Sequence, residues 1–427
     1  MSGEESRSLR KVVTVRHAVA LYISSVLGAG ILVVPGLAAR VAGPASILAW
    51  VLLSAASYPF AYTFANLSAL KPESGGIYSF SKNAFGHTVS TMTAWLFVAW
   101  VVLGAPAITL AAGSYLAFAL PISGPEVFVV ASGILVAAYA VNLQGIRLSG
   151  RVQLALVSIM VAILTASVVA SSPSVKVANF SPFLPSGVAS IGVASALIVW
   201  SYLGYENVSN IAEEFENPEK DFGRSVSISV VLISVLYLAI AVTVIGTGAY
   251  ASGTGVTPFA VLMSRIFGSF GGVAVSLFAL VIIFSTVNAY TTGMARVVYA
   301  AAKEGSLPRF LATVNPKTGV PRRALLALFA LITASLIVYY VLGLNVQSGF
   351  LATSGAAILV YVVGSASGIR LLKTGSWRRR ILPWASLAVS LAILPFIGVL
   401  LGASLTVAAV GLAYGYCTRA GRGSAQS

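Results

Sequence analysis

Long runs of apolar residues, separated by short polar connections, are the main pattern along the 427-residue chain. A helix that crosses the hydrocarbon core of a bilayer needs about 20 mostly apolar residues. The segments that meet this condition lie near residues 16–40, 44–69, 89–119, 125–142, 150–171, 187–212, 225–249, 271–301, 323–342, 346–369, 381–398 and 401–417. The pattern therefore predicts an all-α polytopic membrane protein.

The last two spans, 381–398 and 401–417, are short, and Leu401–Ser404 is the one turn signal near them. They form either two helices or one broken, tilted element, so the sequence predicts twelve or eleven spans. The longest polar connections lie around Glu213–Arg224 and Lys303–Arg323. Because neither is long enough for a separate domain, we expect one membrane-embedded unit.

The composition supports this interpretation. Hydrophobic residues make up 58% of the chain and charged residues 9%, and the mean hydropathy is +0.94. Soluble domains carry roughly a quarter charged residues. The single cysteine, Cys417, excludes an intrachain disulfide framework. The two histidines, His17 and His87, lie far apart in the sequence, so we expect no metal site, and we expect no cofactor.

The basic residues indicate how the spans are oriented. The net charge is +15, and 23 of the 26 Lys and Arg residues fall on one side if there are twelve spans. The other side receives Arg40, Lys176 and Arg265. Cytoplasmic loops carry an excess of Lys and Arg, so both termini are predicted to be cytoplasmic in a multi-pass cell (plasma) membrane protein. Basic residues scattered over many segments predict no nucleic-acid partner.

The first span, between Arg16 and Arg40, is interrupted near its midpoint. Gly28 and Gly30 lie there, and Pro35 follows. Glycine weakens a helix and lets the backbone approach a ligand closely. The alternative is close packing of small residues, which is common between membrane helices.

The sixth span has a second interruption, in the stretch Trp200-Ser201-Tyr202-Leu203-Gly204-Tyr205-Glu206. An ionisable residue at such depth in the bilayer is costly and usually marks a transport pathway or a charged partner. Glu206 is followed by the polar residues Asn207, Ser209 and Asn210. The alternative is a structural carboxylate that accepts hydrogen bonds from backbone N–H groups freed by the break.

The two interruptions fall five spans apart. Interrupted helices at corresponding positions of two halves indicate an inverted-repeat transporter with a midplane site. In the predicted topology the outer half of the first span begins near Gly30 and Ile31, and its free N–H groups suit a carboxylate. The outer half of the sixth span ends near Trp200 and Ser201, and its free carbonyls suit an ammonium group. The two together suit an α-amino acid.

Several motifs resemble those of the amino acid–polyamine–organocation superfamily of transporters. In chain order they are Gly28-Ala29-Gly30-Ile31 with Pro35, Glu73-Ser74-Gly75-Gly76-Ile77-Tyr78, Ala212-Glu213-Glu214-Phe215-Glu216-Asn217-Pro218-Glu219-Lys220, Glu304-Gly305-Ser306-Leu307-Pro308, Val314-Asn315 and Gly319-Val320-Pro321. Each motif is weak alone, but their order and spacing are specific.

The resemblance implies one transporter domain over residues 1–427. Its core, about 12–370, would be a five-plus-five inverted repeat of the first ten spans, with two peripheral helices at about 381–417. The resemblance also implies alternating access around a central site and the following substrate-contacting residues: Ser25, Gly28, Ala29, Gly30, Trp200, Ser201, Leu203, Asn288 and Tyr290. Trp200 is similar to a gating aromatic of the family, and Glu206 to its proton-responsive glutamate.

One position departs from the family pattern. Many proton-coupled relatives carry a lysine where this chain has Met160, whereas exchangers and some bacterial exporters lack that lysine. The sixth span resembles bacterial exporters of methionine and branched-chain amino acids. No other charged residue lies near the predicted midplane besides Glu206, so neutral, apolar amino acids are the expected substrates.

The ion that drives transport is left open by the sequence. A proton-linked cycle would act through Glu206, and amino acid exchange would need no coupled ion. Sodium coupling would use the Ser285 and Thr286 hydroxyls, although such hydroxyls more often bond their own helix backbone. An enzyme is not expected, because the chain shows no nucleophile–base pair or nucleotide-binding loop. A membrane sensor that binds without transporting is the remaining alternative.

Overall fold

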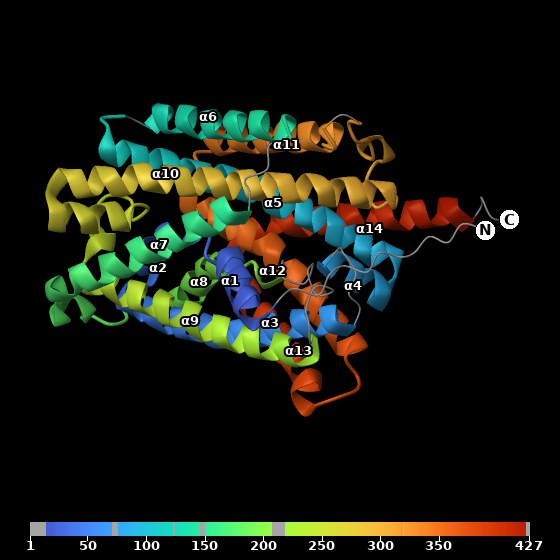
Figure 1. Cartoon of the computed structure of the whole chain (residues 1–427), viewed down its shortest axis with the longest axis horizontal. Coiled ribbons are helices and arrows are strands. Elements are labelled where there is room, and N and C mark those ends of the chain that lie inside the picture. The colour runs from blue at the N-terminus through green and yellow to red at the C-terminus, as the bar shows by residue number, and fades with distance from the viewer. Residues whose placement is uncertain are drawn as a thin grey trace.

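The computed structural model describes residues 14–70, 76–122, 124–145, 150–206, 218–316 and 318–423. All regular structure in these residues is helical, and Figure 1 shows the helices running mostly along the long axis of the molecule. The all-α polytopic fold predicted from the sequence is confirmed. The predicted residues Asn207, Ser209 and Asn210, the acidic stretch to Asn217, and Glu73–Gly75 lie outside the described residues.

The helices keep the labels of Figure 1. The elements are α1 (Val15–Val26), η1 (Ala29–Leu32), α2 (Val34–Ala42), α3 (Ser46–Leu70), α4 (Gly76–Phe85), α5 (His87–Ala119), α6 (Gly124–Leu143), α7 (Gly150–Ser171), α8 (Ala189–Ile198), η5 (Val199–Tyr202), α9 (Pro218–Gly246), α10 (Pro258–Lys303), α11 (Arg322–Val341), α12 (Val346–Leu371), α13 (Trp377–Ile393), η9 (Leu394–Leu400) and α14 (Leu401–Gly423).

Nine helical stretches in the described part of the chain are long and apolar enough to cross a bilayer. This number is smaller than twelve for two reasons. The predicted spans 16–40 and 187–212 are broken into short helices, and the last two predicted spans fall within one helical stretch, Trp377–Arg419. The apolar segments were therefore located correctly, and the breaks lower the number of long helices.

The last two spans are two antiparallel helices, because the start of α13 and the end of α14 lie on the same face of the molecule. Gly398, with φ 66°, turns the chain within η9. The predicted turn signal at Leu401–Ser404 is wrong, since those residues form the first turn of α14. A turn signal made of Leu401 and small residues is compatible with helix, whereas only glycine adopts positive φ at little cost.

Three other boundaries differ from the prediction. α9 begins at Pro218 instead of residue 225. α10 begins at Pro258, and a kink at Gly268 (φ 64°) separates its first turns from the predicted span 271–301. α4 is an additional short helix, which the spacing of apolar runs did not predict. Ten residues are too few to cross a bilayer, so a search for long apolar runs does not detect them.

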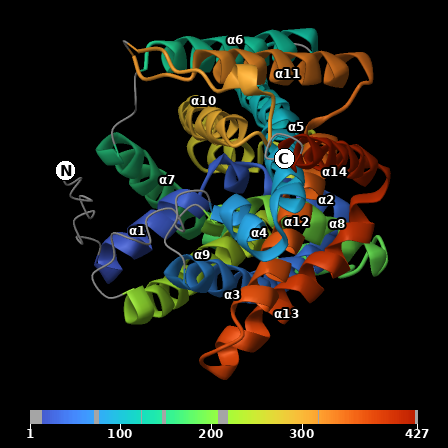
Figure 2. The ribbon, with the colours of Figure 1, turned by 90° about the vertical axis from the view of Figure 1, so that its right-hand side faces the viewer.

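The helices pack in two groups. α1, α2, α3, α8 and α9 contact one another in the first group, and α5, α6, α10 and α11 contact one another in the second. Figure 2 shows α6 and α11 along one edge of the bundle and α3, α9 and α13 along the opposite edge. In spans, the first, second, sixth and seventh form one group, and the third, fourth, eighth and ninth form the other.

The two ends of the bundle carry different charges. One end, here called the basic face, holds α4, the end of α10, the start of α13 and the end of α14, and Figure 2 looks onto it. Arg370 lies over the Phe85 ring there, and Arg323 donates to the carbonyl of Phe310. The opposite face holds the three basic residues Arg40, Lys176 and Arg265.

Candidate functional site

The first break lies between α1 and α2. Leu27 and Gly28 leave helical geometry, and a short 3-10 turn, η1, follows. Among the described residues no acceptor bonds the backbone N–H groups of Ala29 and Gly30. The carbonyl of Leu32 accepts a hydrogen bond from the Tyr115 hydroxyl of α5 at 2.7 Å. The break therefore leaves two donors available near the middle of the bundle, and Tyr115 satisfies one acceptor.

The second break follows α8. The 3-10 turn η5 ends at Leu203, which is extended, and Gly204 has φ 125°. A Cβ at Gly204 would lie 2.4 Å from the carbonyl oxygen of Ser25, so only glycine fits there. The Ser25 hydroxyl donates to the carbonyl of Gly204 at 2.8 Å. The breaks of the two helices are thus in direct contact.

Tyr237 of α9 joins the same two breaks. Its buried hydroxyl lies 2.8 Å from the carbonyl oxygen of Ser201 and 3.3 Å from that of Val26. One lone pair of the Ser201 carbonyl is therefore already in use. The hydroxyl of Ser201 is buried and has no hydrogen-bond partner within the described residues.

Glu206 is buried beside the second break. Its carboxylate accepts the N–H of Gly204 at 3.0 Å and the hydroxyl of Tyr361, from α12, at 2.5 Å. The Tyr361 ring is itself held edge-on by Phe60 and Phe64 of α3. The carboxylate therefore does accept a freed backbone N–H, as the structural alternative required, and it also lines a cavity.

A cavity of about 310 Å³ lies between the breaks and the basic face. Its polar lining comes from Ser24, Ser25, Glu206, Ser285, Thr286 and Tyr290. Its apolar lining comes from Leu27, Phe97, Trp100, Val101, Leu156, Val157, Met160, Ile282, Ala289, Met294 and Val297. Among the described residues that line this cavity, Glu206 is the one with a charged side chain. The cavity thus offers a carboxylate, several hydroxyls and a largely apolar wall.

Trp200 fills the space on the other side of the breaks. Its ring lies 4.5 Å from that of Phe350, measured between centroids, and Phe350 on α12 is fully buried. A Cβ at Gly30 would lie 2.4 Å from the indole, and one at Gly104 of α5 would lie 2.7 Å from it. Because Gly30 and Gly104 have no side chain, they leave the space that the Trp200 indole occupies. This space is called the seat of Trp200. A second cavity of about 30 Å³, next to this seat, is lined by Trp200, Leu203 and Tyr290 among others.

The predicted substrate-contacting residues divide into two sets. Ser25, Gly28 and Tyr290 line the large cavity, and Trp200 and Leu203 line the small one, with Tyr290 shared. The others lie behind these surfaces: Ala29, Gly30, Ile31, Ser201 and Asn288.

Asn288 points away from both cavities. Its side-chain oxygen accepts from the Asn142 amide of α6 at 2.7 Å, and the Thr292 hydroxyl donates to Asn142 in the same network. The family resemblance implied that both Asn288 and Tyr290 contact the substrate, but residues two apart on a helix lie about 200° apart. The structure places only Tyr290 against the cavities.

Ser285 and Thr286, the two candidate sodium ligands, both line the large cavity. The Thr286 hydroxyl donates to the carbonyl of Ile282, one turn back, at 2.9 Å, and its methyl group faces Gly28. That contact is the back-bonding described as the alternative for this residue. Ser285 is nearly buried and lines the cavity wall.

Met160 also reaches the large cavity. It is 1% exposed and shares the lining with Glu206. The position where related proteins carry a lysine is therefore occupied by an uncharged side chain close to the carboxylate. The structure thus places Met160, where the resemblance implies a lysine in many proton-coupled proteins, in the wall of the cavity that Glu206 also lines.

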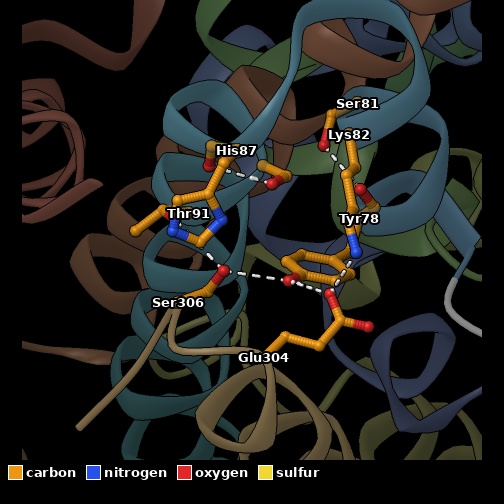
Figure 3. Close-up of polar contacts among 8 residues, drawn as sticks. Tyr78, Ser81, Lys82, His87, Thr91, Glu304 and Ser306 are labelled. Atoms are coloured by element: carbon orange, nitrogen blue, oxygen red, sulfur yellow. Dashed lines mark hydrogen bonds and ion pairs between the residues drawn. The ribbon is translucent and has the colours of Figure 1, made fainter. Parts of the chain in front are cut away.

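A polar cluster ties α4 to the end of α10 on the basic face, as Figure 3 shows. Glu304 accepts from Lys82 at 2.7 Å and from the Tyr78 hydroxyl at 2.9 Å. Ser306 bonds Tyr78 at 2.9 Å and accepts from Thr91 at 3.1 Å. Partial burial alone would raise the pKa of the Glu304 carboxyl, but the bonds from Lys82 and Tyr78 and the Lys82 charge lower it overall. Burial raises the pKa of Tyr78 to about 12.

Sequence reasoning missed Gly104, Tyr237, Phe350 and Tyr361. Each is an ordinary apolar-span residue in sequence, and each acts through a partner more than thirty residues away. A buried tyrosine in an apolar helix is a weak signal, because its hydroxyl usually needs a partner, but the partner cannot be named from the sequence.

Comparison with known proteins gives the family of the chain. The profile described as "Amino acid permease" matches residues 14–414. An uncharacterized amino acid permease of Bacillus subtilis is 31% identical over 90% of this chain and 90% of its own length.

Two further relatives have named substrates. The L-methionine/branched-chain amino acid exporter of Escherichia coli is 28% identical over 86% of this chain and 87% of its own length. The methylthioribose transporter of Bacillus subtilis is 26% identical over 75% of this chain and 73% of its own length. These proteins are transporters, and none is an enzyme.

Proposed function

The chain belongs to the amino acid permease family, within the amino acid–polyamine–organocation superfamily, and on that premise we propose that it carries neutral, apolar amino acids by alternating access. The observation that supports the proposal is the contact between the two helix breaks, where the unbonded N–H groups of Ala29 and Gly30 directly follow Gly28 in the wall of a largely apolar cavity. The relative that exports methionine and branched-chain amino acids supports the same substrate class.

The substrate carboxylate binds the N–H groups of Ala29 and Gly30. These donors lie at the start of η1, which leads into α2, and the positive end of a helix dipole favours an anion. The substrate ammonium lies toward the carbonyls that end η5 and toward Glu206. Backbone groups of this kind recognise the part common to all amino acids, so they set the class of substrate and leave its side chain to the cavity wall.

The side chain of the substrate is apolar. The described lining of the large cavity has aromatic, branched and methionine side chains and no Lys or Arg, so an anionic side chain would have no partner among these residues. A volume of about 310 Å³ accommodates a substrate of the size of leucine or methionine. A cationic substrate side chain could pair only with Glu206 among the described residues. This pairing would compete with the hydrogen bonds that Glu206 accepts from Gly204 and Tyr361.

The structure corresponds to one state of the alternating-access cycle. The cavity lies between the breaks and the basic face, whereas Trp200, Phe350 and the glycine seat fill the opposite side. The excess of basic residues assigns the basic face to the cytoplasm, so both termini are cytoplasmic and the protein resides in the cell membrane. The state is therefore the one that exchanges substrate with the cytoplasm.

Glu206 couples transport to a proton by gaining and losing it during the cycle. Its contact with Tyr361 and Gly204 connects the protonation state to the break in the second helix. Amino acid exchange is the second candidate, favoured by Met160 in place of a basic residue. Sodium coupling is the third, and the back-bonded hydroxyl of Thr286 weighs against it.

Uptake of labelled leucine, methionine and arginine into proteoliposomes tests the proposal, with methylthioribose as a competitor. A pH gradient, a sodium gradient and internal amino acid are applied as separate driving forces. Accumulation of leucine or methionine driven by the pH gradient is expected. Inhibition by methylthioribose alone, with no amino acid uptake, would contradict the substrate assignment.

The coupling role of Glu206 is tested with Glu206→Gln in the same assay. The amide keeps an acceptor for the Gly204 N–H but cannot exchange a proton. We expect gradient-driven accumulation to be lost while exchange against internal amino acid continues. An unchanged rate and pH dependence would remove Glu206 from coupling.

A further inference from the structure

A dense group of basic residues surrounds the start of α13. It lies on the basic face, where α13 forms the lower edge of the bundle in Figure 2. Five basic residues and no acidic residue occur between positions 370 and 380, and no Asp or Glu follows Glu304 in the whole chain. The group consists of Arg370, Lys373, Arg378, Arg379 and Arg380.

One side of α13 faces away from the protein and is apolar. Its residues recur at helical spacing, and several are strongly exposed, Trp377 by 60%, Ile381 by 53%, Trp384 by 59% and Leu391 by 50%. The other side is buried against the bundle, through Pro383 for example. Tryptophan is enriched where a membrane protein meets the lipid headgroups. The exposed stripe therefore places the start of α13 at headgroup level.

Within the part of the chain that the structure describes, none of these five basic side chains forms an ion pair. In the described residues the ion pair between Lys82 and Glu304 is the one that forms, and it lies on other helices. The Nε atom of Arg379 is buried without a hydrogen-bond acceptor. The Arg378 guanidinium lies 5.6 Å from the centre of the Trp377 ring. Arg378 and Arg380 are exposed, so their guanidinium groups are accessible to an anion from outside the chain.

The position of the arginines in the helix strengthens this argument. α13 begins after Ser376, whose side chain caps the N–H of Arg379, and Arg378, Arg379 and Arg380 occupy its first turn. The first turn carries the positive end of the helix dipole, so basic residues are unfavourable there. An anion bound at this turn would offset both the dipole and the three side-chain charges.

The topology signal does not explain this arrangement by itself. Any Lys or Arg in a loop serves to orient a span, wherever it lies in the loop. Here arginine is used three times in succession, in a helical turn, next to exposed tryptophan. The planar guanidinium forms paired hydrogen bonds with phosphate oxygens, which lysine cannot reproduce.

We propose that Arg378, Arg379 and Arg380, with Trp377 and Trp384, form an α13 lipid surface that binds the headgroups of anionic phospholipids of the phosphatidylglycerol type. The guanidinium groups contact the phosphodiester, and the tryptophans lie against the glycerol and the upper acyl chains. Each basic residue near an anionic membrane surface contributes roughly fivefold in affinity. The three arginines together therefore give a marked preference for anionic over zwitterionic lipid.

Tryptophan quenching by brominated lipid tests this surface in the purified, reconstituted protein. A minor fraction of brominated phosphatidylglycerol is added to phosphatidylcholine bilayers and compared with brominated phosphatidylcholine. Quenching by phosphatidylglycerol above its share of the bilayer is expected. The double variant Trp377→Phe/Trp384→Phe is expected to lose this excess, which places the bound lipid at α13.

The arginines are tested by the triple variant Arg378→Gln/Arg379→Gln/Arg380→Gln. We expect its preference for phosphatidylglycerol to fall at least about tenfold. The matched control Arg309→Gln/Arg322→Gln/Arg323→Gln removes the same charge from the same face and is expected to keep the preference. Substitution of the three α13 arginines by lysine maintains charge and orientation, and controls for folding.

Three outcomes would overturn the proposal. Equal losses in both glutamine variants would show a general charge effect, and an unchanged preference in the α13 variant would place the lipid elsewhere. Displacement of brominated phosphatidylglycerol by soluble inorganic phosphate would assign the arginines to a free anion. Lipid that stays bound in the presence of phosphate supports the surface.

Discussion

Trp200 is held by two residues that have no side chain. The indole lies between Gly30 at the first break and Gly104 in the middle of α5, and it contacts Phe350 of α12. Packed interiors leave little space for an added methyl group. The position of this tryptophan therefore depends on the size of residue 104, on a helix that contributes no backbone break of its own.

Gly104→Ala tests this dependence. The new methyl group would lie 2.7 Å from the outermost ring atom of Trp200, so the indole must leave its seat. Overpacking of this kind typically costs about 1–3 kcal/mol. We expect the uptake rate to fall roughly tenfold, because the state in which the opposite face is filled becomes less populated.

Gly133→Ala is the matched control, since a Cβ at Gly133 in α6 meets nothing within 4 Å. Both variants should reach the membrane in normal amount, which surface biotinylation or purification yield measures. Wild-type uptake in Gly104→Ala would show that the seat is not needed for transport.

At the scale of elements, the two breaks are connected by hydroxyl groups from intact helices. The Tyr237 hydroxyl of α9 donates to the carbonyl of Ser201 at 2.8 Å and lies 3.3 Å from that of Val26, and Tyr115 of α5 donates to the carbonyl of Leu32. In lipid, a backbone group without a partner is costly, so a broken helix needs such neighbours. Both breaks therefore depend on hydroxyl groups supplied by the intact helices α5 and α9.

Tyr237→Phe is expected to lower the thermal stability of the purified protein. Loss of the hydroxyl leaves the carbonyl of Ser201 without its bond from α9, at a cost of about 1–3 kcal/mol. A thermal unfolding curve in detergent measures the change. Tyr416→Phe, at a 71% exposed position on α14, should show no shift. Equal melting temperatures for all three proteins would contradict the role of the hydroxyl.

The contact between α4 and the end of α10 predicts a pH dependence of stability. The pKa of Glu304 is lower in the folded protein than its usual value, chiefly because the bonds from Lys82 and Tyr78 outweigh its partial burial. A depressed carboxyl pKa contributes stability above the unfolded pKa, and this contribution is lost as pH falls through the folded pKa. The pair is largely exposed, so its contribution is small.

We therefore expect Glu304→Gln to melt slightly below wild type at neutral pH and at the same temperature in acid below the usual carboxyl range. A double-mutant cycle with Lys82→Ala separates this pair from the rest of the cluster. A stability difference that is independent of pH would show that the carboxylate charge is not what matters.

At the scale of the whole molecule, the space around the two breaks is asymmetric. A cavity lies on one side of the breaks, and packed side chains fill the other side. The large cavity reaches from Glu206 past Gly293 toward the basic face. Trp200 and Phe350 occupy the space between the breaks and the opposite face. In the proposed alternating-access cycle, the two helix groups shift relative to each other before substrate passes to that side.

Thiol labelling measures this asymmetry. In a Cys417→Ser background, Gly293→Cys places a sulfur in the cavity without a clash, because a Cβ there meets nothing within 4 Å. We expect a membrane-impermeant reagent to label it from the cytoplasmic side, in inside-out vesicles. Val177→Cys, 86% exposed on the opposite face, should label in intact cells instead. The reverse pattern would invert the proposed orientation.

Much of the architecture follows from local patterns in the sequence. The length of each apolar run determines a span, and glycine with polar neighbours near residues 28–30 and 200–206 determines where two spans break. The excess of basic residues at one end of the bundle follows from the order of the spans, because alternate connections between spans lie at the same end. These are local properties, because a lipid environment acts on every residue of a span in the same way.

The partners of the site residues were decided only by the tertiary structure. Glu206 was found as a buried carboxylate, but its bond to Tyr361 was not, and Asn288 turned to Asn142 instead of the cavity. The seat of Trp200 depends on Gly104, on another helix. Apolar spans look alike in sequence, so the rotation of each helix and the choice of its neighbours arise from side-chain packing between residues far apart in the chain.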